Sequence, residues 1–111
     1  MVDHDLCEKT AGLASRVGSL ANKQDGSDKT ALLEQQDRLA KLALAAIVKD
    51  LSAEDKDYQA AIGGLRKATD SVQQADQKIG SVANAISLVA KAAGLVEQAL
   101  SAAAKAGIAG V

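Results

Sequence analysis

The chain has 111 residues, with 24 Ala, a single Tyr and no Pro, Phe or Trp. That length corresponds to one domain covering 1–111, and that composition favours helix almost everywhere while giving a β-sheet few of the residues it needs. The 14 acidic residues almost balance the 13 basic ones. The molecule therefore has no overall field that would draw it onto nucleic acid. We expect an all-α protein that does not bind nucleic acid.

The start of the chain and its cysteine content suggest the cytoplasm. Residues 1–5 lack the basic start and the apolar run of a signal peptide. Cys7 is the only cysteine, so no internal disulfide can form, and a reducing compartment is the simpler setting. We expect a cytoplasmic protein.

Two groups of turn and capping residues divide the first half of the chain. In 23–28, Gly26 suits the end of one helix and Ser27 can cap the next. Further along, Ser52 followed by Asp55 forms a weaker capping box. These signals predict helices over about 4–23 and 28–50, and a third helix that begins near residue 53.

The first two helices differ in their apolar patterns. The first has one apolar side, which fits an outer helix; its residues are Leu6, Thr10, Leu13, Val17 and Leu20. The second is apolar in nearly all directions between 39 and 48, where Lys41 is the only polar residue. A helix of that kind needs cover on several sides, so we expect it to be central.

The second half of the chain carries an unbroken heptad pattern, here called the 58–103 stripe. Every position at alternating three- and four-residue steps is free of strongly polar side chains: Tyr58, Ala61, Leu65, Ala68, Val72, Ala75, Ile79, Val82, Ile86, Val89, Ala93, Val96, Leu100 and Ala103. The phase continues through Gly80, which predicts one long, coiled-coil-like helix over about 53–106. The alternative is a break at Gly80 with Ser81 capping a fourth helix, which gives a four-helix up-down bundle.

The long-helix interpretation also predicts a partner. A helix over 53–106 would extend roughly 80 Å, whereas the two preceding helices extend only about 30 to 35 Å and cannot cover it. The uncovered apolar surface would be buried against a second copy, most simply as a dimer, or against another helical protein. We therefore expect a non-enzymatic assembly or interaction module. Its predicted contact residues are Leu65, Val72, Ile79, Val82, Ile86, Val89, Val96 and Leu100.

Candidate chemistry is confined to the N-terminus. His4 and Cys7, together with the neighbouring acids, have spacings that can share a helix face and hold a metal. The simpler interpretation is helix capping by Asp5 and Glu8, so we expect no metal and no cofactor. Elsewhere the carboxylates alternate with lysines, as on a solvated surface, and no acid–base or nucleophilic pair is evident. Gly63 and its neighbour Gly64 lack the context of a phosphate loop and indicate a close helix crossing or a bend.

A membrane-active or lipid-surface protein is the competing interpretation. Residues 79–111 are rich in apolar and small side chains and could lie in a bilayer interface. Against this, the segment has few lysines and no aromatic anchor, and its longest charge-free run is too short to span a bilayer unaided. Packing against a partner helix is therefore the favoured use of this segment.

Overall fold

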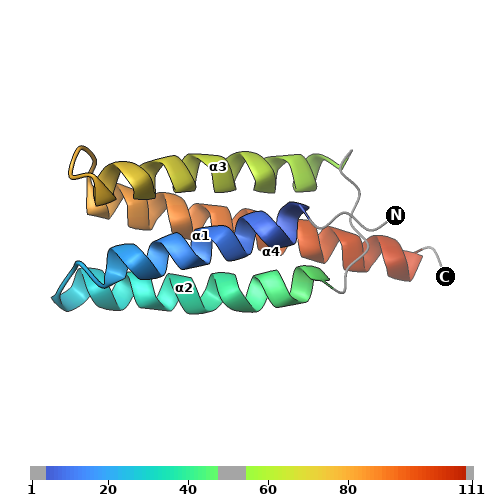
Figure 1. The fold of residues 1–111 in the computed structure, drawn as a ribbon. Helices are drawn as coiled ribbons and strands as arrows, with labels where there is room; N and C mark the ends of the chain where they lie inside the picture. Colours follow the sequence, from blue (N-terminus) through green and yellow to red (C-terminus); the bar gives the residue numbers. More distant parts are fainter. Residues whose placement is uncertain (1–4, 48–54, 110–111) are drawn as a thin grey trace.

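Two helical hairpins make up the fold in this computed structural model, which describes residues 5–47 and 55–109, with side chains as far as 103. Within these ranges lie four helices: α1 (Asp5–Ala21), α2 (Gly26–Ile47), α3 (Lys56–Asp76) and α4 (Val82–Ala109). They form an up-down bundle with extents of 48, 20 and 19 Å (Figure 1). The all-α prediction is confirmed.

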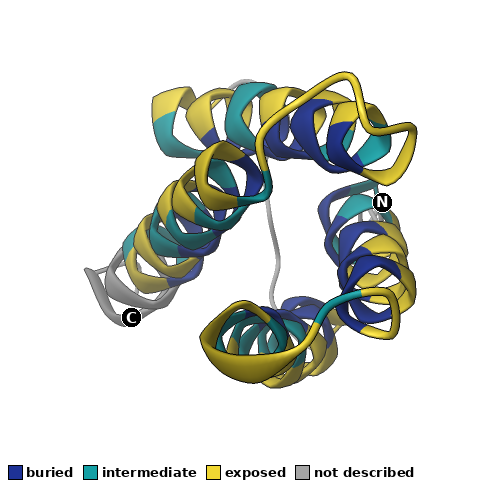
Figure 2. Ribbon diagram, turned by 90° about the vertical axis from the view of Figure 1, so that its left-hand side faces the viewer, coloured by how far each residue is buried: buried dark blue, intermediate teal, exposed yellow. Residues whose placement is uncertain are grey.

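The four helices form a ring around a shared core. Each helix packs most extensively against its hairpin partner, α1 against α2 and α3 against α4, while α1 also contacts α3 and α2 contacts α4. Successive helices alternate in direction along the rod, so the contacts between hairpins join parallel helices (Figure 1). Seen along the rod, the buried residues face the centre of the ring (Figure 2).

The two turns lie close to the predicted signals, but the bounds differ: α2 begins at Gly26, which was predicted to end the preceding helix, so Ser27 lies within α2 and not at its cap. The first turn covers 22–25 and leads into Gly26, whose φ of +64° is a conformation that favours glycine. Asp55 caps α3, its side chain accepting a hydrogen bond from the Asp57 backbone N–H at 3.0 Å. Ser52, the other half of the predicted capping box, lies outside the described residues.

The predicted long helix over 53–106 is wrong, because the chain reverses between α3 and α4. The end of α3 is a Schellman motif: the Ile79 N–H donates to the Gln74 carbonyl at 2.9 Å, and the Lys78 N–H donates to Ala75 at 3.1 Å. Ser81 then accepts a hydrogen bond from the Asn84 N–H at 3.2 Å. The alternative with a break at Gly80 is confirmed. A heptad phase carries no information on chain direction, so it survives a turn of suitable length.

Glycine at position 78 should stabilise the protein. Lys78 has a φ of 64°, a left-handed conformation that costs a residue with a Cβ about 1 kcal/mol or more. We expect Lys78→Gly to raise the free energy of unfolding by about 0.5–1 kcal/mol, measured by chemical denaturation. Lys78→Ala is the control, because it removes the charge and keeps the Cβ. An equal gain in the two variants would contradict this explanation.

The core is built unevenly from the four helices. The apolar side predicted for α1 is fully buried, from Leu6 to Leu20. In contrast, α2 buries only Leu32, Leu39, Ala43 and Ala46. Its other large apolar side chains include Leu44, which is 67% exposed. The prediction that this helix is central is therefore wrong: no helix occupies the middle of the ring, and α2 is covered on one side only (Figure 2).

Among the described residues, two ion pairs join the hairpins. Lys23 pairs with Asp76 where the first turn meets the end of α3, and Arg38 on α2 pairs with Glu97 on α4 at 2.8 Å. The hydrogen bond from Arg38 lowers the pKa of Glu97 and raises the pKa of Arg38. Because both side chains remain partly exposed, such a pair stabilises a protein by about 0.2–1 kcal/mol.

The Arg38–Glu97 pair predicts a pH-dependent effect. A carboxyl whose folded-state pKa is depressed contributes stability above its unfolded-state pKa, and the contribution is lost as pH falls through the folded-state pKa. We expect Glu97→Gln to lower the free energy of unfolding by about 0.5 kcal/mol at neutral pH and to have no effect in strong acid. Glu34→Gln is the matched control, because Glu34 is exposed on α2 and belongs to no ion pair among the described residues. A pH-independent loss would contradict the assignment.

Candidate interaction surface

The 58–103 stripe lies inside its own chain. Leu65, Val72, Val89, Val96 and Leu100 are each at most 7% exposed, and Val82 and Ile86 are partly buried against the same core. The premise that residues beyond 79 lack cover within the chain is therefore wrong: α4 packs against both α3 and α2. Only Ile79, in the α3–α4 turn, is strongly exposed among the predicted contact residues, at 73%.

An apolar strip, here called the α2 strip, lies on the outer face of α2. It consists of Leu33, Ala40, Leu44 and Ile47, all exposed. At 100° per residue these positions fall within about 60° of one another, so they form one line along the helix. Together with Ile79, its three larger members are the exposed large apolar side chains of the described residues.

A polar pair interrupts the α2 strip. Asp37 lies on the same face and accepts a hydrogen bond from Lys41 at 2.8 Å, an interaction that raises the pKa of Lys41. The pair separates Leu33 from the longer part of the strip, which ends at Leu44 and Ile47. A charged pair within an apolar line restricts the registers in which another helix can pack there, because a wrong register places an apolar side chain on a charge.

The residues predicted as metal candidates do not form a site that the structure describes. His4 lies outside the described residues, and Cys7 is a free thiol packed half-buried against the core. In the described part of the chain, no group of three or more His, Cys, Asp or Glu side chains could hold a metal ion. Asp5 and Glu8 lie in the first turn of α1, and Asp5 also pairs with Lys9 at 3.4 Å.

The fourth helix meets the size requirement for a membrane span. Its segment Val82–Ala103 is 22 residues long and apolar enough to cross a bilayer by length and composition. In the bundle, however, its most apolar side faces α2 and α3, and its exposed side carries polar residues such as Ser87, Lys91 and Glu97. The segment is therefore amphipathic in this fold.

The α3–α4 crossing explains the glycine pair. A Cβ at Gly64 would lie 2.6 Å from Leu95 Cδ1, whereas a Cβ at Gly63 would have no atom within 4 Å. The predicted close approach therefore holds for Gly64. Beside the pair lies a groove of about 390 Å³, lined by Ala60, Gly63, Gly64, Lys67, Leu88, Lys91, Ala92 and Leu95.

The two adjacent glycines should respond differently to alanine. Gly63→Ala adds a methyl group in open space and removes the helix penalty of glycine, so we expect the free energy of unfolding to rise by about 1 kcal/mol. In Gly64→Ala the same propensity gain is offset because Leu95 must move. Chemical denaturation measures both, and equal gains would contradict the close packing at Gly64.

In comparisons with protein-family models, curated proteins and solved structures, none matched this chain. Its function is therefore inferred from its own surface and core.

Sequence reasoning did not predict the exposed apolar strip on α2. It assigned the apolar residues of α2 to the interior because they point in nearly all directions. One signal was available: Asp37 and Lys41 lie on the same helical line as Leu33 and Leu44, which is typical of a face in contact with water.

Proposed function

We propose that this protein is a non-enzymatic helical interaction module, which packs the α2 strip against a helix of a second copy or of another helical protein. The observation that carries the proposal is the alignment of Leu33, Leu44 and Ile47 on one exposed helical face. Burying such a line against another helix removes apolar surface from water, and its spacing fits ridges-into-grooves packing. The 58–103 stripe serves a different purpose in this proposal, as the internal core.

A second copy is the simplest partner. The strip extends over 14 residue steps, roughly 21 Å, and can meet its own copy across a two-fold axis. Such a surface is smaller than a standard interface, so the association should be weak and concentration-dependent. The Asp37–Lys41 pair presents both signs of charge beside the strip, which allows complementary contacts between two copies of this face.

The titratable groups with resolved pKa shifts lie in ion pairs on the surface of the bundle. The resolved pKa shifts at Arg38, Lys41 and Glu97 arise first from hydrogen bonds within surface ion pairs. Catalytic groups, by contrast, are typically shifted by burial in a cleft beside other functional groups.

Substitution on the α2 strip tests the proposal. We expect the average mass from sedimentation equilibrium to rise above the one-chain mass of 11.3 kDa as the wild-type concentration increases. Leu44→Asp should keep the protein at one-chain mass, because it places a charge in the middle of the surface that would be buried on association. Since Leu44 is 67% exposed, the variant retains the core. Ile79→Asp is the matched control: it makes the same kind of change at a 73% exposed site away from the strip, and should associate like the wild type.

Two results would contradict self-association. One is a wild-type protein that remains at one-chain mass throughout the concentration range. The other is a Leu44→Asp variant that associates as strongly as the wild type.

A membrane-active role is the second candidate, favoured by the length and apolar character of Val82–Ala103. It requires α4 to leave the core and bring Val89 and Val96 into contact with lipid. Co-sedimentation with anionic vesicles that resists high salt and requires these valines would favour this role. Retention of the protein in the supernatant would exclude it.

A further inference from the structure

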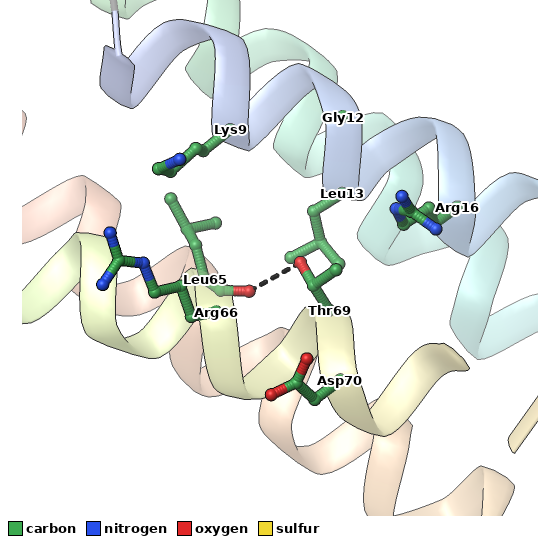
Figure 3. A pocket seen from close by; sticks show the side chains of 8 residues that line it. All are labelled: Lys9, Gly12, Leu13, Arg16, Leu65, Arg66, Thr69 and Asp70. Atoms are coloured by element: carbon green, nitrogen blue, oxygen red, sulfur yellow. Dashed lines mark hydrogen bonds between the residues drawn. The ribbon is translucent and has the colours of Figure 1, made fainter. Parts of the chain in front are cut away.

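A cationic groove runs between α1 and α3, on a side of the bundle away from the α2 strip. Its volume is about 350 Å³, and its lining residues are Lys9, Gly12, Leu13, Arg16, Leu65, Arg66, Thr69 and Asp70 (Figure 3). Near Arg16 it adjoins a second hollow of about 210 Å³ between the same two helices. The residues come from two segments more than 45 positions apart, so the packing of the hairpins creates this groove.

The groove has an excess of positive charge. Three cations line it against one carboxylate, whereas the whole chain has a formal net charge of −1. Lys9 and Arg66 extend toward the same end of the groove, and Arg16 lies at the other end (Figure 3). Among the described residues, Arg16 and Arg66 have no ion-pair partner.

The floor of the groove offers little apolar surface. Leu13 and Leu65 are each 1% exposed, so a bound molecule cannot bury much of either side chain. The Thr69 hydroxyl donates to the Leu65 carbonyl at 2.7 Å, which occupies its proton. Gly12 leaves open space, since a Cβ there would meet no atom within 4 Å. A ligand would therefore contact mainly the cationic groups and the space beside Gly12.

We propose that the α1–α3 groove binds a phosphate-class oxyanion, either free or as the anionic group of a larger ligand. Guanidinium groups match the geometry of phosphate oxygens, and charge-assisted hydrogen bonds are about twice as strong as neutral ones. Lys9 adds a further positive charge at the end of the groove where Arg66 lies, although its ammonium also pairs with Asp5 at 3.4 Å. The α3–α4 groove fits such an anion less well, because it has two lysines and no arginine, and because Leu95 occupies the space beside Gly64.

A titration of the full chain with sodium pyrophosphate tests the proposal. At low ionic strength, we expect saturable amide shifts in ¹H–¹⁵N spectra, confined to residues 9–16 and 65–70, with a millimolar dissociation constant. Arg16→Gln combined with Arg66→Gln should weaken binding at least about tenfold, because two charge-assisted contacts are lost. Gly12→Leu should weaken it by filling the groove while every charge is retained.

Lys67→Gln combined with Lys91→Gln is the matched control. It removes the same charge from the neighbouring α3–α4 groove and should weaken binding much less than the arginine double variant does, because neither lysine lines the α1–α3 groove. Equal weakening by both double variants would overturn the proposal, since it would mean that pyrophosphate responds only to overall charge. Thermal unfolding of each variant verifies that the fold is retained.

Vesicles distinguish the source of the phosphate group. If the natural source is a lipid headgroup, vesicles of phosphatidylglycerol should bind the chain, neutral phosphatidylcholine vesicles should not, and the Arg16–Arg66 double variant should lose this binding. Saturable pyrophosphate binding without vesicle binding supports a free phosphate compound. The absence of binding to both pyrophosphate and phosphatidylglycerol vesicles would overturn the proposal.

Discussion

The need to cover two apolar sides of α4 determines the architecture. Val89 and Val96 are completely buried, and the alanines around them are buried as well, so α4 requires a helix on each flank. In the hairpin, α3 covers only one flank of α4. The second is covered by α2, while α1 closes the ring against α3. The α3–α4 hairpin alone cannot remove these side chains from water, so the two hairpins must fold together.

This arrangement also explains the surface. Because α2 contributes few buried residues, its apolar side chains outnumber its inward positions, and Leu33, Leu44 and Ile47 remain in contact with water. The parallel contact of α1 with α3 leaves a groove between the two helices, which Lys9 and Arg16 line from α1 and Arg66 lines from α3. The two proposed binding surfaces are thus consequences of how the same four helices share one core.

Much of the helix content was predictable from the sequence. Alanine content, the absence of proline, the turn before Gly26 and the apolar side of α1 each reflect local physical preferences. Continuity across Gly80 was predicted wrongly, because the seven-residue spacing of Val72, Ile79 and Ile86 is preserved whether the chain continues or reverses. In the α3–α4 turn the left-handed conformation is adopted by Lys78, which carries no glycine signal.

The surfaces were less predictable than the helices. An apolar residue on α2 can face either the core or the solvent, and the choice depends on which helices surround it. The α1–α3 groove depends on contacts between residues distant in the chain, and no local pattern near Lys9 or Arg66 indicates them. Both features arise from tertiary packing, which a single sequence specifies only indirectly.

The central claim is that the 58–103 stripe is covered by helices of its own chain. Isotope-filtered nuclear Overhauser spectra of a mixture of labelled and unlabelled protein test it directly. The structure predicts that contacts of Val72, Val89 and Val96 with leucines of the α1–α2 hairpin occur within one chain. Observation of these contacts only between a labelled and an unlabelled chain would contradict it.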